Sequence, residues 1–475
     1  MNYKILLINP ISSDKKTYIR IGRCQTQAQP GIECWPPVDL ALIGTALKKI
    51  NNVSNVVLYD AQRENNYKKM YPYIKNEAPQ IVILNCTTPT VFSDIEVAEQ
   101  IKKDNKECLI IFFGLHATAR PLDIMKSSFV DCCVRGEPED TISLVVRDYI
   151  EKGKRDFGSI YNIVYLSNEN EIIETKRKEV KSSDFLHLIP ARSLIDNQYY
   201  KLMYNNKPFT IIQTSRGCLN NCIYCTASMY SAHYSCRSVE SVLEEIKECI
   251  KKYEIRDFLF LSDTFTANRK WVEEFCNKLI FEKIQIRWMS NSRIDKIDYS
   301  LAKIMKESGC WIVSLGIESY DENILRRAKK NINRHQIVQT VNILYSVKIK
   351  TIGYFMFGLP GESKESIGNT IKFSLSLPLD YAYFYHTTPF PGTVLFEIAK
   401  KSHWLLTVDW TQYAHGKKVL LAYDGLSVKD VERAVRKAYC KFYFRPRQVI
   451  NQLSTIHSIR VLFNNLKAVF NLLSK

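Results

Sequence analysis

Several features that define other protein classes are missing from this sequence of 475 residues. No apolar run reaches the roughly 18 residues that a helix needs to cross a bilayer, which excludes an integral membrane protein. No signal peptide precedes the strand-like run Ile5 to Ile8, and the 14 cysteines are scattered, so we expect a cytoplasmic protein without a disulfide framework. No RNA-recognition motif accompanies the net charge of +17, and we expect no nucleic-acid partner.

Three cysteines stand apart from this scatter. Cys218, Cys222 and Cys225 lie in the run Ser-Arg-Gly-Cys-Leu-Asn-Asn-Cys-Ile-Tyr-Cys-Thr. Three thiolates in one tight loop suit an iron-sulfur cluster whose fourth iron has no protein ligand. A zinc site would need a fourth ligand, and no second Cys-x-x-Cys pair is present. Because Cys236 or His233 could supply that ligand, a zinc-binding adaptor without catalytic activity stays an alternative.

Short apolar strands alternate with helical patterns from residue 209 onward. The helix after the cysteine loop is expected to begin at Ser238, which can cap it. Strands and helices in alternation predict a parallel sheet with right-handed crossovers and with functional residues at the carboxyl ends of its strands. Asp263, Arg293 and Glu318 stand at such ends. The six expected strands cover residues 209–214, 258–261, 286–289, 312–317, 351–357 and 381–385.

The cysteine spacing, with Tyr224 before the last cysteine, resembles the cluster loop of the radical S-adenosylmethionine (SAM) superfamily. The resemblance implies a (β/α)6 partial barrel and a 4Fe-4S cluster that, given an electron from an external flavodoxin- or ferredoxin-type reductant, cleaves SAM to a 5'-deoxyadenosyl radical. The run Ser-Leu-Gly-Ile-Glu-Ser is similar to the fourth-strand motif of that family, which implies that the Glu318 carboxylate contacts the SAM ribose. The expected SAM-binding residues are Tyr224, Asp263, Arg293, Gly316, Glu318 and Ser319.

The first 150 residues have a different pattern, with five short apolar runs separated by segments that include helical patterns. This arrangement predicts a doubly wound, Rossmann-like α/β domain that binds a ligand at the carboxyl ends of its strands. No Gly-x-Gly-x-x-Gly follows the first strand, so a dinucleotide site is poorly supported. The five expected strands cover residues 4–9, 56–59, 81–85, 109–113 and 130–134.

Placed before such a barrel, this first unit resembles the cobalamin-binding domain of B12-dependent radical SAM proteins. The Asp-x-His-x-x-Gly signature of proteins that supply an axial histidine is absent, so we expect cobalamin without an imidazole ligand from that motif. His116 is a candidate neighbour of the lower face, although a structural role in a turn is the other interpretation. The cobalamin-binding residues that the resemblance implies are Asn9, Pro10, Thr87, Thr88, Gly114, His116, Gly136 and Glu137.

The chain is therefore expected to hold a cobalamin-binding domain (1–150), a linker with a small hairpin (151–206), a radical SAM barrel (207–400) and a mostly helical extension (401–475). From residue 445 to 475, apolar residues recur at helical spacing and all charges are basic. Such a helix can lie on an anionic membrane surface, here the inner face, or it can pack on the barrel.

The two implied cofactors together indicate an enzyme that methylates an unactivated carbon of a natural-product or lipid-like small molecule. A cobalamin-dependent oxidative cyclase or mutase without net methyl transfer is one alternative. A methylthiotransferase with a second cluster on Cys24, Cys34 and Cys86 is another, although Cys24 and Cys34 do not follow expected strands. The sequence does not identify the substrate.

Overall fold

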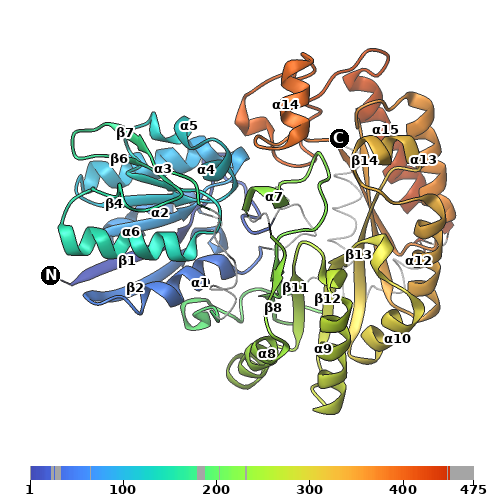
Figure 1. Ribbon diagram of the computed structural model, residues 1–475, viewed down its shortest axis with the longest axis horizontal. Helices are drawn as coiled ribbons and strands as arrows, with labels where there is room; N and C mark the ends of the chain where they lie inside the picture. Colours follow the sequence, from blue (N-terminus) through green and yellow to red (C-terminus); the bar gives the residue numbers. More distant parts are fainter. Residues whose placement is uncertain are drawn as a thin grey trace.

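The structure is a computed structural model that describes residues 2–22, 26, 34–64, 66–178, 188–202, 204–230, 233–446, 448 and 449. Two parallel sheets, one in each half of the chain, form the framework, and Figure 1 shows them side by side. No helix in the described ranges has the length and apolar character that a membrane span requires. The segment 451–475, which carries most of the predicted amphipathic tail, lies outside the described residues.

The first sheet has seven strands in the order β2-β1-β3-β4-β5-β6-β7. Strands β1 to β5 are parallel, and Ile5 of β1 pairs with Val56 of β2 and Ile81 of β3. Strands β6 and β7 form the expected hairpin, which continues the sheet in antiparallel fashion. The strands are β1 Tyr3–Asn9, β2 Val53–Asp60, β3 Ile81–Asn85, β4 Leu109–Phe113, β5 Cys132–Val134, β6 Ile163–Leu166 and β7 Ile172–Glu174.

Helices cover both faces of this sheet, because the strands are apolar on both sides. Ile5 and Leu7 pack with α1 and α6 on one face, and Leu6 and Ile8 pack with α2 and α3 on the other. The order 2-1-3-4-5 is that of a doubly wound fold, whose ligands bind where the strand order reverses, here between β1 and β3. The helices are α1 Val38–Leu47, α2 Tyr67–Glu77, α3 Val91–Asp104, α4 Leu115–Ala119, α5 Pro121–Met125 and α6 Glu139–Lys152.

The second sheet has six parallel strands in the order β15-β14-β13-β12-β11-β8. Near the β8 edge, Leu259 of β11 pairs with Ile211 of β8 and Met289 of β12, whereas the central pairs β12–β13 and β13–β14 each contain a register shift. The sheet is a partial barrel, since β8 and β15 are its two edges. The strands are β8 Phe209–Gln213, β11 Asp257–Leu261, β12 Arg287–Ser292, β13 Cys310–Glu318, β14 Lys350–Phe357 and β15 Tyr381–His386.

The helices of this half pack their apolar stripes on the outside of the barrel. Ser238 caps α8 as expected, accepting a hydrogen bond from the Ser241 amide at 3.2 Å. An irregular segment separates α14 from α15, and α15 returns to cover β15. The helices are α8 Val239–Tyr253, α9 Arg269–Phe281, α10 Tyr299–Glu307, α11 Glu322–Arg327, α12 Arg334–Ser346, α13 Lys364–Ser376, α14 Val394–Lys401 and α15 Val428–Tyr443.

An apolar seam joins the two halves. Phe390, Phe396, Trp410, Tyr413 and Leu420, all from the end of the barrel and the irregular segment, belong to the core that covers one face of the first sheet. Figure 1 shows α14 and its flanking loops beside α4 and α5. The carboxyl end of the chain therefore supplies part of the core of the first domain.

Candidate functional site

The three cysteines lie on one loop between the two-residue strand β9 (Ser215–Arg216) and the short helix α7 (Ala227–Tyr230). Strand β9 pairs with β10 (Ser235–Cys236), and Gly217 follows it with a φ of 77°. A Cβ atom at position 217 would lie 2.0 Å from the carbonyl oxygen of His233, so only glycine permits this tight turn into Cys218. All three thiols are half-buried.

Polar groups surround these thiols. The Asn220 side-chain amide lies 3.5 Å from the Cys218 sulfur, and the Ala227 amide donates to the Cys225 sulfur at 3.5 Å. Such donors stabilise thiolates that ligate iron. The loop is held to the barrel because the Ile223 amide donates to the Ala328 carbonyl at 3.1 Å. Three thiols without a fourth on the same loop fit an iron-sulfur cluster.

The alternative zinc ligands lie elsewhere on the loop and its flank. Cys236 is in β10, where it pairs with Ser215, and His233 touches the Gly217 turn through its backbone. Within the part of the chain that the structure describes, no three His, Cys, Asp or Glu side chains converge closely enough to hold a single metal ion.

Glu318 ends β13 with an unusual backbone. Its φ is 65°, and the register with β14 shifts between Gly316 and Glu318. The buried carboxylate accepts a hydrogen bond from Lys330 Nζ at 3.0 Å. A Cβ atom at position 316 would lie 2.5 Å from Glu318 Oε1 and 2.6 Å from Lys330 Nζ. Gly316 therefore makes room for this ion pair.

Lys330 is a site residue that the sequence analysis missed. It follows Lys329 in a run of charge that resembles an exposed surface, yet it is only 8% exposed. The only signal in the sequence is that its loop follows the helix after the Glu318 motif. Arg293 supports it, since Nη2 of Arg293 donates to the Lys330 carbonyl at 3.0 Å and Nε donates to Asp295 at 2.8 Å.

The other expected SAM-binding residues have varied surroundings. Burial, together with the charges of Glu318 and Cys222, raises the pKa of the Tyr224 hydroxyl well above its usual value. Asp263 follows β11 and is half-buried. Ser319 is fully buried, and its hydroxyl lies 3.3 Å from Thr370 of α13. The structure thus gathers Tyr224, Glu318 and Lys330 near the cysteine loop, whereas Ser319 contacts the helix layer.

The carboxyl edge of the first sheet is a network of buried polar side chains. Asn9 donates to Asp60 at 2.9 Å and accepts from Gln62 at 2.8 Å, and the Tyr200 hydroxyl donates to Asp60 at 2.6 Å. Burial raises the pKa of Asp60 to about 6. A residue of the linker therefore closes one side of this edge.

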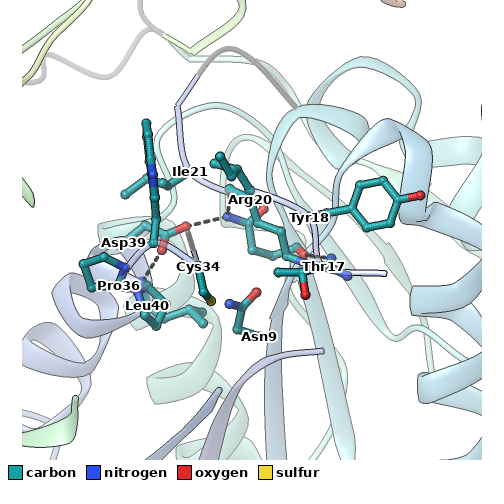
Figure 2. Close-up of a pocket in the computed structure, with 13 residues that line it drawn as sticks. Asn9, Thr17, Tyr18, Arg20, Ile21, Cys34, Pro36, Asp39 and Leu40 are labelled. Carbon is teal, nitrogen blue, oxygen red and sulfur yellow. Dashed lines mark hydrogen bonds between the residues drawn. The ribbon is translucent and has the colours of Figure 1, made fainter. Parts of the chain in front are cut away.

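A pocket lies over the same edge, between β1, β3 and the start of α1. Figure 2 shows Asn9, Cys34 and Asp39 around it. Arg20 forms two hydrogen bonds of 2.9 Å to the buried Asp94 and one of 2.8 Å to the Asn85 carbonyl. Burial raises the pKa of Asp39 to about 6. Backbone and side-chain polar groups thus surround a hollow at the switch point of the sheet.

His116 is fully buried. Its Nδ1 lies 3.4 Å from the Thr88 hydroxyl, and its ring meets that of Trp410 edge to face, with centroids 5.4 Å apart. Burial lowers the pKa of His116 to about 4, so the imidazole is neutral at pH 7. Gly114 precedes it with a φ of 112°, and a Cβ atom there would lie 2.4 Å from Asn85 Oδ1. These contacts favour the structural role for His116.

The remaining expected cobalamin contacts lie on neighbouring turns. Thr87 bonds to Thr90 at 2.7 Å, and the Gly136 amide donates to the Thr118 hydroxyl at 3.0 Å. Glu137 is different, because its carboxylate forms a buried ion pair with Arg216 of the barrel half. Burial raises the pKa of Glu137 to about 7, although the charge of Arg216 opposes the shift.

Comparison with known proteins agrees with this geometry. The family model for the radical SAM superfamily matches residues 212–374, and the model for the B12 binding domain matches residues 33–146. The chain belongs to the family of radical SAM proteins that carry a cobalamin-binding domain. The predicted fold class, the radical SAM enzyme and its cofactors (a 4Fe-4S cluster, SAM and cobalamin) are confirmed with the family.

The relatives cover most of the chain. "Uncharacterized methyltransferase PH0819" of Pyrococcus horikoshii is 32% identical over 89% of this chain and 91% of its own length. An "Anaerobic magnesium-protoporphyrin IX monomethyl ester cyclase" of Rubrivivax gelatinosus is 25% identical over 76% of this chain and 66% of its own. The structure of "radical S-adenosylmethionine methyltransferase, TsrM", from Kitasatospora setae has a TM-score of 0.72 at 16% identity, covering 94% of this chain and 92% of that one, and this likeness shows the fold.

The cysteines of the methylthiotransferase alternative are not gathered by any described contact. Cys86 is fully buried after β3, where burial raises its thiol pKa well above 9, and Cys34 lies at the pocket edge, 3.8 Å from Asp60. Cys24 lies outside the described residues.

Proposed function

We propose that this enzyme transfers a methyl group from SAM, by way of cobalamin, to carbon in a small-molecule substrate. The observation that carries the proposal is the 32% identity, across both domains, to a relative whose name is that of a methyltransferase. When bound, the cluster and SAM supply a radical that can remove hydrogen from carbon, and cobalamin supplies a carrier for the methyl group. The protein must hold the two cofactors at facing edges of its two sheets.

The residues of the barrel edge have assigned roles in this proposal. Cys218, Cys222 and Cys225 would hold the cluster. Glu318 would accept hydrogen bonds from the ribose hydroxyls of SAM, because a carboxylate can accept from both at once. Lys330 and Gly316 fix the position of that carboxylate, and Arg293 fixes Lys330 through its carbonyl. Tyr224 and Asp263 flank the same space.

The residues of the first sheet have their roles by position. The turns after β1, β3, β4 and β5 meet at one edge, as the carboxyl ends of parallel strands must. Backbone and side-chain polar groups of these turns would hold cobalamin there, whereas the His116 ring is packed against Trp410. Glu137 serves the ion pair with Arg216 rather than the cofactor. The contacting residues are Asn9, Pro10, Thr87, Thr88, Gly114 and Gly136.

Product analysis tests this function. Protein reconstituted without oxygen should hold about four irons, as one 4Fe-4S cluster requires, and one cobalt per chain. A methyltransferase forms S-adenosylhomocysteine as well as 5'-deoxyadenosine when its substrate is present. A cyclase, which the Rubrivivax relative supports as the second candidate, forms 5'-deoxyadenosine without stoichiometric S-adenosylhomocysteine. Iron without cobalt would contradict both candidates.

Two partners belong to the same proposal. The reductant is an acidic flavodoxin or ferredoxin, because the chain carries a net charge of +17 and opposite charges steer association. The exposed Leu219 places the cluster loop near the surface, where an electron can enter. The basic tail contacts the inner membrane surface and brings a lipid-like substrate to the barrel.

The domain limits also stay a proposal. The cobalamin-binding unit is proposed for 1–150, the linker for 151–206, the barrel for 207–400 and the extension for 401–475. The hairpin of the linker adds to the first sheet, so the linker and the first unit share one framework.

A further inference from the structure

A buried ionic cluster joins the two domains one residue from the Gly217 turn into Cys218. Arg216 at the end of β9 forms ion pairs with Glu137 and Glu139 of the first domain, and these side chains are 8%, 5% and 2% exposed. All three guanidinium nitrogens are engaged. Nη1 donates to both carboxylates, Nη2 donates to Glu139, and Nε and Nη2 donate to Gln213 Oε1 at 3.0 and 2.8 Å.

Each partner of Arg216 is fixed by its own element. Gln213 is the last residue of β8, so its hydrogen bonds hold the guanidinium from the barrel side. Glu139 is the first residue of α6, where the amides of the helix N-terminus favour a carboxylate. The turn before it is held by the hydrogen bond from Gly136 to Thr118. Arg216 therefore connects two rigid edges.

The charges around this cluster are unbalanced without Arg216. Glu137 feels the negative charges of Glu139 and Asp263, and Asp39 of α1 feels that of Glu139. Acidic groups from both halves thus face one another where the two cofactor edges meet. The positive charge of the Arg216 guanidinium allows these carboxylates to lie close together. Its planar arrangement of N–H donors also fixes their orientation.

Other described links between the halves are an apolar seam, which includes the hydrogen bond from Trp410 Nε1 to Asp123 at 3.2 Å, and the contacts of the linker. The apolar seam of Phe390, Phe396 and Trp410 packs into the core of the first domain, and burial of apolar area has little angular preference. The linker adds the bond from Tyr200 to Asp60. Because these links do not depend on Arg216, we expect the domains to stay together in a variant at this position.

We infer that Arg216 is a positioning residue that sets the distance and orientation between the cluster loop and the cobalamin-binding edge. It does so through Gly217 and Cys218 on one side and through Glu137 and Glu139 on the other. The inference rests on the proposed function, in which a methyl group passes between cofactors on these two edges. Arg216 and Gly217, which directly precede Cys218, thus couple the positions of the two cofactors.

The direct test measures the spacing of the two cofactors. Arg216→Gln removes the charge and the fork, and Arg216→Lys keeps the charge alone. Each holoenzyme is reconstituted with iron, sulfide and hydroxocobalamin and reduced, and the dipolar coupling between the spins of the cluster and of cobalt(II) is recorded by pulsed electron paramagnetic resonance. Wild type should give one narrow distance, Arg216→Gln a broad distribution, and Arg216→Lys an intermediate one. A wild-type distribution in Arg216→Gln overturns the inference.

A matched control lies within the first domain. Asp131, before β5, is buried and pairs with Lys102 at 2.8 Å and Arg155 at 2.7 Å. Asp131→Asn also weakens a three-residue ionic cluster around a buried carboxylate, but one that does not reach the barrel. It should lower stability and leave the spin distance narrow. A distribution as broad as that of Arg216→Gln would show that general loosening, rather than lost positioning, is responsible, and would overturn the inference.

Two further readouts separate this inference from the proposed function. The rate of S-adenosylhomocysteine formation relative to 5'-deoxyadenosine formation should fall at least tenfold in Arg216→Gln and stay constant in Asp131→Asn. Wild-type enzyme that forms no S-adenosylhomocysteine refutes methyl transfer, and the spin distance still decides the role of Arg216. If cobalamin does not bind, or if Arg216→Gln does not fold, the positioning role is tested by comparing amide hydrogen exchange in Arg216→Lys with that in wild type. Faster exchange at both 136–142 and 213–218 supports the inference, and a change at one side alone overturns it.

Discussion

Gly316→Ala should weaken SAM binding and lower the stability of the fold moderately. The added Cβ atom would lie 2.5 Å from Glu318 Oε1 and 2.6 Å from Lys330 Nζ, whereas ordinary contact begins near 3.4 Å. The two side-chain tips must therefore move by almost 1 Å, and their 3.0 Å hydrogen bond breaks. The backbone need not move, because both atoms that the methyl group meets are the ends of side chains.

The magnitude follows from the bond that is lost. A hydrogen bond between charged groups contributes about 1.5–3 kcal/mol. If the displaced carboxylate also loses its alignment with the ribose, SAM affinity should fall roughly 10- to 150-fold, at about 1.4 kcal/mol for each factor of ten. The free energy of unfolding should fall by about 0.5–2.5 kcal/mol, because the preference of a strand for alanine over glycine, about 0.5–1 kcal/mol, offsets only part of the lost hydrogen bond.

Anaerobic calorimetry of SAM binding to the cluster-loaded enzyme measures the first quantity, and thermal unfolding measures the second. Gly368→Ala is the matched control, because, apart from its chain neighbours and the backbone of its own helix, no atom of the described residues lies within 4 Å of a Cβ at that position. It should leave SAM affinity unchanged and raise stability slightly. SAM binding by Gly316→Ala within threefold of wild type would refute the role of the Glu318–Lys330 pair.

Three more predictions concern the cluster, the buried histidine and the tail. Cys222→Ser should lower the iron content from about four per chain to below one, whereas Cys236→Ser should keep it; iron loss in the second variant would revive a fourth cysteine ligand. Since burial lowers the pKa of His116 from 6.5 to about 4, the unfolded chain binds more protons between these values, and the folded state loses stability as the pH falls from 6.5 towards 4. In urea titrations, the unfolding free energy should drop between pH 7 and pH 5 by about 2 kcal/mol less in His116→Gln than in wild type. An equal drop in the two proteins would contradict the assignment. Deletion of 451–475, which spares the bonds of Arg445 and Gln448 to the carbonyls of Leu375 and Leu379, should abolish binding to anionic liposomes; intact binding would remove the membrane proposal.

The strands of both sheets could be predicted from the sequence because each is a short apolar run with its own signal. The runs at 81–85 and 109–113 match β3 and β4 residue for residue. The third barrel strand differs at its carboxyl end, since β12 continues to Ser292 through the polar Ser290 and Asn291. Polar residues belong to that strand because its end faces the site rather than the core. A pattern of apolar residues cannot predict such a polar strand end.

The candidate site was predictable where its residues are close in sequence. The cysteine loop and the Gly316–Glu318 motif are local patterns, and both lie where the barrel argument expects them. Lys330 and the Arg216–Glu137 pair depend on how distant segments fold together. Glu137 precedes Arg216 by 79 positions, and a single sequence holds no information on which buried carboxylate an arginine will meet. The pairing of Arg216 with Glu137 therefore depends on how the two domains pack against each other.

The apolar seam limits how this architecture can be recombined. Because Phe390, Phe396, Trp410, Tyr413 and Leu420 complete the core of the first domain, that domain is not a contiguous module of the chain. A chimera that exchanged only residues 1–150 between two relatives would pack the first domain of one protein against the seam residues of the other. The apolar surfaces at this contact would not match. A transplantable cobalamin unit would have to carry residues 390–420 with it, as a graft of two separate segments.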